Sequence, residues 1–181
     1  MNPSRRKFLK RGLIGGGLLV LAGTLPFAFR TTALGRRPRR ELRLLSLEEH
    51  AVLAAAAARL VPGDGAGPAW PTAEAVDCAG KVDALLATCH PDVGNDFRRL
   101  LRLFESGFFG TFIAASPRPF TRATLAEQDA RLEAWRCSRF TMLRSGYQAI
   151  KRLTHAAYYS SPEVFARVGY AGPPEVPQVP A

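Results

Sequence analysis

Most of the chain consists of stretches in which apolar residues recur every three or four positions, separated by short segments rich in proline and glycine. This spacing places the apolar side chains on one face of an α-helix. The helices are expected at residues 46–60, 73–88, 93–114, 124–137 and 139–158, followed by a short helical turn from Ser161 to Gly169. No stretch alternates convincingly with the period of two that strands require. The pattern therefore predicts an all-α fold, a single small helical domain of about five helices.

Two of the expected helices carry long apolar faces. The face of 93–114 consists of Phe97, Leu100, Leu101, Phe104, Phe108 and Phe112. The face of 139–158 consists of Phe140, Leu143, Tyr147, Ile150 and Thr154. We expect both faces in the core, because an apolar stripe of this kind packs against neighbouring helices. Arg98, Arg99 and Arg102 point away from the first stripe and are expected to form a solvated surface.

Capping boxes mark the starts of two helices. Ser46 is followed three residues later by Glu49, and Thr124 by Glu127. In this pattern the hydroxyl accepts a hydrogen bond from a first-turn amide, and the glutamate accepts one from the amide of the cap residue. Both sites are therefore predicted helix N-termini.

The N-terminus of the chain resembles a twin-arginine export signal. Its residues are Ser4, Arg5, Arg6, Phe8, Leu9 and Lys10. A glycine-studded apolar run from Gly12 to Phe29 follows, and glycine lowers both helix propensity and apolar area. The alternative is a chance arginine pair ahead of a transmembrane helix.

The sequence leaves two alternatives for this signal, cleavage or retention. Signal peptidase requires small residues at alternate positions, and Ala33-Leu34-Gly35 is the nearest match. The alternative is that the apolar run stays attached as a membrane anchor, since 18 residues just reach the spanning length. The arginines that follow would then lie near anionic headgroups or in a solvated linker. The expected organisation is an export signal or anchor at 1–35, a basic linker at 36–45, a helical domain at 46–170 and an extended proline-rich tail at 171–181.

The net charge of +10 suggests nucleic acid as a partner, but the location of the charge argues against it. Residues 1–35 hold six basic and no acidic residues, and residues 36–43 hold five basic residues against Glu41. From Leu44 onward there are 14 basic and 14 acidic residues. The excess charge therefore belongs to targeting, and no nucleic-acid partner is expected.

No pattern of catalytic residues stands out. His50, His90 and His155 lie far apart in unrelated contexts, and the sequence has no nucleophile elbow, dinucleotide-binding glycine motif or C-x-x-C pair. We therefore expect no catalytic, cofactor-binding or metal-binding residue in this chain. A stand-alone exported helical enzyme, or an exported small-ligand-binding protein, is the alternative.

The three cysteines, Cys78, Cys89 and Cys137, fit no zinc or iron–sulfur spacing. An odd number in an exported protein suggests one pair and one free thiol, or a bond to another chain. If Cys78 and Cys89 pair, Cys137 is left to bridge to a partner. The alternative is that the cysteines are small buried residues, above all Cys78 within a helix.

Several motifs together resemble a known family. They are the twin-arginine signal, Leu45-Ser46-Leu47-Glu48-Glu49 before an alanine-rich helix that ends in Arg59-Leu60-Val61-Pro62-Gly63-Asp64-Gly65, then Tyr158-Tyr159-Ser160-Ser161-Pro162-Glu163 and Gly169-Tyr170-Ala171-Gly172-Pro173-Pro174. In their order and spacing they resemble the small subunit of membrane-bound flavin dehydrogenases of the gluconate 2-dehydrogenase type, the subunit 3 family. The resemblance spans about residues 45–174, and residues 90–140 contribute little to it.

The resemblance implies a large partner, a glucose-methanol-choline type flavoprotein that holds FAD. It also implies a multihaem cytochrome c, with haem c, as a third subunit. The small subunit would bind the folded flavoprotein and carry it through the Tat translocase to the periplasm, at or anchored to the inner membrane. Catalysis would belong to the flavoprotein, whose sugar or alcohol substrate the sequence does not reveal.

The expected contact with the partner lies near the C-terminus, where amphipathic tyrosines of the kind enriched at interfaces gather. The candidate residues are Tyr158, Tyr159, Pro162, Tyr170 and Pro173, together with Cys137. The alternative is that the tyrosines close the core of the small domain itself.

Overall fold

The computed structural model describes residues 32–34, 38–62, 70–106 and 118–174. Within these ranges the helices are α2 (Leu47–Leu60), α3 (Cys78–Leu86), α4 (Pro91–Glu105), α6 (Leu125–Arg136), α7 (Thr141–Tyr159) and α8 (Pro162–Phe165), with a 3₁₀ turn η1 (Phe120–Arg122). The described ranges contain no strand. The all-α prediction is confirmed. The twin-arginine residues lie outside the described ranges, as do Phe108 and Phe112.

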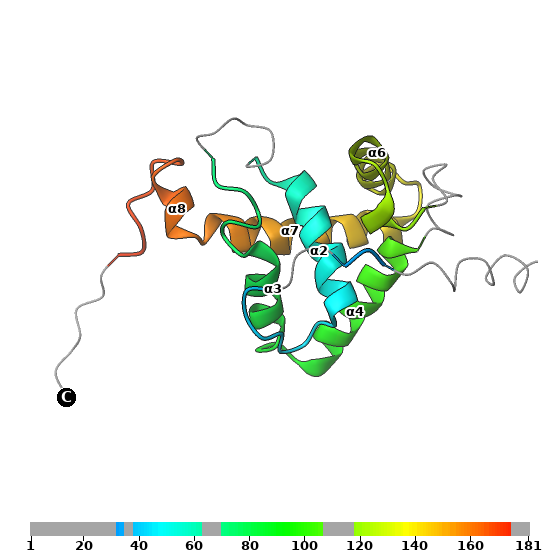
Figure 1. The fold of residues 1–181 in the computed structure, drawn as a ribbon, viewed down its shortest axis with the longest axis horizontal. Coiled ribbons are helices and arrows are strands. Elements are labelled where there is room, and N and C mark those ends of the chain that lie inside the picture. Colours follow the sequence, from blue (N-terminus) through cyan, green and yellow to red (C-terminus); the bar gives the residue numbers. More distant parts are fainter. Residues whose placement is uncertain (1–31, 35–37, 63–69, 107–117, 175–181) are drawn as a thin grey trace, which may run out of the picture.

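Helix α2 is the centre of the domain. It contacts α3, α4, α6, α7 and η1, while the long helix α7 runs behind and also contacts α3, α6 and α8 (Figure 1). The alanines of α2 allow neighbouring helices to approach closely, and Ala56 and Ala57 are fully buried. Among the helices of the described part, none is both long and apolar enough to cross a bilayer.

Aromatic side chains from three segments fill one end of the core. The ring of Phe104 lies 4.5 Å from that of Phe120 and meets Trp135 edge-on at 4.8 Å, measured between centroids. Gly146 of α7 lies against this cluster, because a Cβ there would stand 2.9 Å from the Trp135 ring. A side chain at position 146 would therefore push α7 away from the cluster.

Three helix starts differ from the expectation, and that of α7 lies two residues late, at Thr141. Helix α3 begins at Cys78 instead of residue 73, because Asp77 adopts left-handed backbone angles with φ of 52° and cannot continue a helix. Residues 73–77 form turns instead, closed by hydrogen bonds such as Cys78 N–H to the Ala73 carbonyl. Helix α4 begins at Pro91, two residues early, because proline is well suited to a first helical position and the His90 side chain accepts from Asp92 N–H.

The apolar face expected for residues 139–158 is confirmed for Leu143, Tyr147, Ile150 and Thr154, which are buried. The prediction for Phe140 is wrong. Phe140 is the N-cap of α7 and is 55% exposed, with the Arg139 guanidinium 5.0 Å from its ring. As a residue ahead of the first helical turn, it does not follow the direction of the helix face.

Candidate functional site

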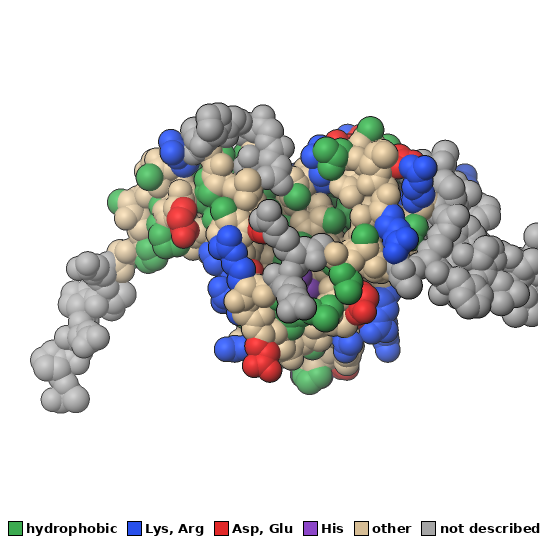
Figure 2. Space-filling view, viewed as in Figure 1, with side chains coloured by type: hydrophobic (Ala, Val, Ile, Leu, Met, Phe, Trp, Pro, Cys, Tyr) green, Lys and Arg blue, Asp and Glu red, His purple; other side chains and the backbone are tan. Residues whose placement is uncertain are grey.

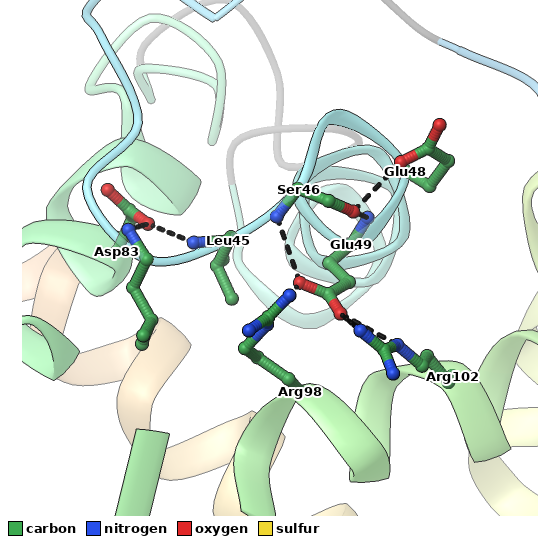
Figure 3. A network of polar contacts seen from close by, with 8 residues as sticks. Leu45, Ser46, Glu48, Glu49, Asp83, Arg98 and Arg102 are labelled. Atoms are coloured by element: carbon green, nitrogen blue, oxygen red, sulfur yellow. Dashed lines mark hydrogen bonds and ion pairs between the residues drawn. The ribbon is translucent and has the colours of Figure 1, made fainter. Parts of the chain in front are cut away.

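The motif Leu45-Ser46-Leu47-Glu48-Glu49 has a structural role at the N-terminus of α2 (Figure 3). The Ser46 hydroxyl accepts from Glu49 N–H at 3.2 Å, and Ser46 N–H donates to the Glu49 carboxylate at 2.9 Å. This confirms the first capping box. The second, at Thr124 and Glu127, is also present.

Glu49 also holds α4 against α2. Its side chain is only 3% exposed, and it accepts from Arg98 at 2.9 Å and Arg102 at 2.8 Å (Figure 3). The side chain of Arg102 is 63% exposed, which agrees with the expected solvated surface, and that of Arg98 is 30% exposed; both guanidinium groups nevertheless reach the buried carboxylate on α2. Arg99 does lie on the surface and pairs with Asp96.

The pKa of Glu49 reflects this environment. Burial alone would raise the pKa, but the hydrogen bond from Ser46 N–H and the two guanidinium groups outweigh it. The pKa of Glu49 is therefore lowered from its ordinary value of 4.5. The carboxylate remains charged at neutral pH and joins α2 to α4.

Asp83 fixes the segment that leads into α2. Its buried carboxylate accepts from three consecutive backbone amides: those of Arg43 at 2.7 Å, Leu44 at 3.0 Å and Leu45 at 2.7 Å. The backbone groups of an entering segment would otherwise lack partners, which is costly in a buried place. Asp83 therefore sets the direction in which the chain enters the domain.

The basic linker makes specific contacts with the turn before α3. Arg39 donates to the Ala75 carbonyl at 2.9 Å, and Arg40 pairs with Asp77 at 2.6 Å. The sequence left two positions open for these arginines, at headgroups or in solvent. In the structure both guanidinium groups contact the surface of the domain, and the side chain of Arg40 is 51% exposed.

A second buried charge lies where α4, η1 and α6 meet. Arg131 is fully buried and donates to the carbonyls of Phe104 at 3.3 Å and Arg118 at 2.6 Å. Nearby, Glu105 accepts from the Thr121 hydroxyl at 2.6 Å and from Thr121 N–H at 3.0 Å. These buried ionisable groups tie segments of the domain together.

His50 is the remaining buried ionisable side chain of α2. Burial lowers its pKa, so the imidazole is neutral at pH 7. Its Nε2 has no hydrogen-bond partner among the described residues, and His50 borders a cavity of about 350 Å³ between α2, the linker and the start of α3. Within the described ranges no three metal-ligating side chains gather.

The candidate partner residues near the C-terminus separate into a buried and an exposed set. Tyr158 is fully buried, and its hydroxyl donates to the Pro71 carbonyl at 2.7 Å. For Tyr158, the structure therefore supports the alternative that this side chain belongs to the core of the small domain itself. The aromatic ring of Tyr159 stands edge-on to that of Tyr158 and is 38% exposed.

The exposed set is suited to contact another protein. Pro162 is the first residue of α8, and Tyr170 is 48% exposed with its ring edge-on to Phe165 at 5.1 Å. Pro173 is exposed one residue after Gly172, whose φ is 109°. We define Tyr159, Pro162, Tyr170 and Pro173 as the C-terminal patch.

The three thiols are free in the structure. Cys78 is buried, its thiol donates to the Thr154 carbonyl at 3.2 Å, and burial raises its pKa to about 12. The conditional pairing of Cys78 with Cys89, which is exposed, is therefore absent. Cys137 is exposed at the C-cap of α6.

The structure does not bring Cys137 and the C-terminal patch together. Cys137 lies four residues before the start of α7, whereas the patch begins at the last residue of α7 and continues beyond it (Figure 1). Helix α7 has 19 residues and is therefore about 28 Å long. A standard interface of about 800 Å² per partner is roughly 30 Å across, so one partner is able to contact both ends.

Near Cys137 in the sequence the structure reveals two exposed apolar side chains, one that the sequence pattern placed in the core and one that it did not single out. They are Phe140 and Met142, which are 55% and 64% exposed. Figure 2 shows hydrophobic side chains over the α8 region and over the α6 region of this face. Both side chains lie at the start of α7, where Phe140 is the N-cap and Met142 is the second helical residue. We define Cys137, Phe140 and Met142 as the α6–α7 patch.

We predict that Glu133→Gln increases the reactivity of Cys137. The thiol donates to the Glu133 carboxylate at 3.2 Å, and this hydrogen bond raises the pKa of Cys137. Without the carboxylate the pKa falls toward its ordinary value of 9.0, and the thiolate fraction at pH 7 to 8 increases. Alkylation of Cys137, followed by mass spectrometry, is expected to be roughly three-fold faster. Cys89 serves as the internal control, and an unchanged rate at Cys137 would contradict the prediction.

Comparison with known proteins gives one match. The model of the family described as gluconate 2-dehydrogenase subunit 3 matches residues 47–172, which include every helix from α2 to α8. No curated protein and no solved structure matches the chain. The matched range runs from the first residue of α2 to Gly172 and so covers both the Glu49 network and most of the C-terminal patch. The chain therefore belongs to the gluconate 2-dehydrogenase subunit 3 family.

Proposed function

We propose that this chain is the non-catalytic small subunit of a membrane-associated, flavin-dependent dehydrogenase complex that oxidises gluconate, another sugar or an alcohol. It binds the folded flavoprotein subunit and directs its export by the twin-arginine pathway. The observation that carries the proposal is the family match over residues 47–172. The export part rests on Ser4, Arg5, Arg6, Phe8, Leu9 and Lys10, which lie outside the described residues.

The internal arrangement of charges supports an accessory role. Glu49, Asp83 and Arg131 are buried, and each binds backbone groups or neighbouring helices. These contacts stabilise the domain as a platform. Exposed apolar side chains lie at both ends of α7, and others lie near the starts of α2, α4 and α6 and at the end of α3. Exposed apolar side chains of this size are suited to an interface.

The proposed complex divides the chemistry among its subunits. FAD belongs to the glucose-methanol-choline type flavoprotein, haem c belongs to a possible cytochrome c subunit, and this chain binds neither. The complex lies in the periplasm at the inner membrane. Because the twin-arginine pathway moves folded proteins, the flavin is inserted in the cytoplasm before export.

A specific observation favours one second candidate, a small-ligand-binding protein that is exported alone. The cavity beside His50 measures about 350 Å³, which is within the range of small-molecule sites. Its polar groups include the Nε2 of His50, which has no partner among the described residues. The affinity capture described next distinguishes between these two candidate functions.

The test is affinity capture through a C-terminal tag from membrane and periplasmic fractions, followed by mass spectrometry and a visible absorbance spectrum. We expect a flavoprotein of several hundred residues with flavin absorbance. A lone, colourless chain would contradict the proposal and favour the second candidate. As a control for export, Arg5→Lys with Arg6→Lys is expected to leave the complex intact but in the cytoplasm.

Two matched double variants locate the interface. Tyr159→Ala with Tyr170→Ala removes the aromatic groups of the C-terminal patch, and Phe140→Ala with Met142→Ala removes the apolar groups of the α6–α7 patch. We expect the tyrosine variant to lower partner capture at least roughly ten-fold, since exposed tyrosines often dominate binding energy. A loss confined to the α6–α7 variant would place the contact at the other end of α7.

A further inference from the structure

One face of α2 consists of alanines and borders the cavity beside His50. Ala51, Ala54, Ala55 and Ala58 recur at spacings of three and four residues, which places them on the same side of the helix. Each of them contributes only a methyl group to the wall of the cavity, whose volume of about 350 Å³ is within the range of small-molecule sites. The small side chains of α2 therefore leave room that larger residues would fill.

His50 contributes an unused polar group to this cavity. The residue is 7% exposed, and its buried Nε2 has no hydrogen-bond partner among the described residues. A buried polar atom without a partner lowers the stability of the fold, because it gives up its hydrogen bonds to water and gains none in return. Such an atom in a native structure calls for an explanation, and a bound molecule that pairs with it is one.

Each of the other hydrogen-bonding side chains along the described lining already has a partner. They are Arg39, Thr72, Glu74, Asp77, Cys78 and Thr121. Among the charged ones, Arg39 donates to the Ala75 carbonyl and Asp77 pairs with Arg40, so a charged ligand would find its counter-charges already engaged. His50 itself is neutral, because burial lowers its pKa. The lining therefore favours an uncharged ligand.

A hydroxyl is the ligand group that suits Nε2 best. In a neutral imidazole, Nε2 donates a hydrogen bond in one tautomer and accepts one in the other. A hydroxyl both donates and accepts, so it pairs with Nε2 in either tautomer, whereas a carbonyl or an ether oxygen pairs in only one.

We propose that this cavity binds an uncharged, mainly apolar small molecule whose hydroxyl group pairs with Nε2 of His50 and whose apolar part lies against the alanines of α2. The site is formed within this chain. It gives a ligand class to the cavity of the second candidate function, and it requires neither the export nor the flavoprotein contact proposed above.

The test is a titration of the purified full-length chain, in detergent micelles, with phenol and with toluene. The two probes are similar in size, but only phenol carries a hydroxyl. Binding is followed by NMR through the methyl signals of ¹³C-labelled alanine. We expect saturable shifts at Ala51, Ala54, Ala55 and Ala58 with both probes, and none at Ala157, which is buried in α7 away from the lining. The ¹⁵N signal of His50 Nε2 is expected to move with phenol, because the hydroxyl forms a hydrogen bond there.

His50→Phe keeps an aromatic ring at this position and removes both ring nitrogens. We expect the variant to bind phenol roughly ten-fold more weakly than wild type and to bind toluene with unchanged affinity, since only phenol loses a hydrogen bond. His155→Phe is the matched control, because His155 is half-buried on α7, bonds to the Lys151 carbonyl and does not line the cavity. It should bind both probes as wild type does. Ala55→Leu places a larger side chain at the wall and leaves the imidazole unchanged, so it should weaken the binding of both probes.

Three outcomes would overturn the proposal. Without saturable shifts at the lining alanines for either probe, the cavity does not accept small molecules. Equal phenol affinities of wild type and His50→Phe, with circular dichroism confirming that both are folded, would show that Nε2 is not the partner. An unchanged Nε2 signal in the phenol-saturated wild-type chain would show the same, even if the variant fails to fold. No partner protein and no translocation step enters this test, so failure of the proposed function does not affect it.

Discussion

Replacing Asp83 with alanine is expected to lower the free energy of unfolding by roughly 3–5 kcal/mol. The carboxylate accepts from the amides of Arg43, Leu44 and Leu45, and the Asp83 side chain is buried. Alanine would leave three amides without a partner and a cavity where the carboxylate was. The measurement is urea denaturation followed by far-UV circular dichroism.

Asp83→Asn tests whether the hydrogen bonds to the three backbone amides account for the loss of stability. Asparagine keeps one oxygen, which still serves Leu44 and Leu45, but turns an NH₂ group toward the Arg43 amide. Its destabilisation should therefore lie between those of wild type and alanine. Asp96→Ala, on an exposed side chain, is the control and should leave stability unchanged within error. An Asp83→Ala protein as stable as this control would show that the entering segment is held by other contacts.

Replacing Glu49 with glutamine is expected to lower the free energy of unfolding by about 2–3 kcal/mol at pH 7. The buried carboxylate accepts from Ser46 N–H and from both Arg98 and Arg102. Glutamine removes the charge that attracts two guanidinium groups and turns an NH₂ group toward donors. Since Glu49 joins α2 to α4, the loss weakens the contact between these two helices.

The effect of Glu49→Gln is also expected to depend on pH in a defined direction. The folded-state pKa of Glu49 lies below the ordinary value of 4.5, so its contribution is complete above pH 4.5 and is lost as the pH falls through the folded pKa. Glutamine does not titrate, so the stability difference between wild type and variant should shrink in acid. Unfolding curves at pH 7 and pH 3 measure this. Glu163→Gln, on an exposed side chain, is the control and should show no resolved dependence on pH, and a constant difference for Glu49→Gln would contradict the assignment.

Local pattern was enough to predict the fold class and most helix boundaries. Capping boxes at Ser46 and Thr124 involve residues only three apart, so the sequence contains the whole interaction. The boundary at α3 was missed because the turn that ends at Asp77 depends on contacts from the linker, including the pair with Arg40. Such a contact joins residues 37 apart and leaves no periodic signal.

At the candidate site, too, the sequence indicated the type of each residue, and the tertiary structure determined its exposure. The sequence indicated which tyrosines were large and amphipathic, but side-chain type does not decide exposure. Tyr158 and Tyr159 are adjacent, yet one is buried against Pro71 and the other is exposed, because successive helix positions point in different directions. Phe140 and Met142 became visible as a patch only once the start of α7 had been located.

By itself the sequence determined the all-α class, the two capping boxes, the neutral charge of the domain and the motifs of the gluconate 2-dehydrogenase subunit 3 family. Each of these depends on residue type and on spacings of a few positions. Only the tertiary structure decided that Glu49 binds two arginines of α4, that Asp83 holds the entry to α2, and that Ala33 N–H binds the Thr121 hydroxyl. These contacts join residues about 40 to 90 positions apart in the sequence. A polar group that folding buries loses its water and needs another polar group as its partner, and only the fold decides which groups are buried together.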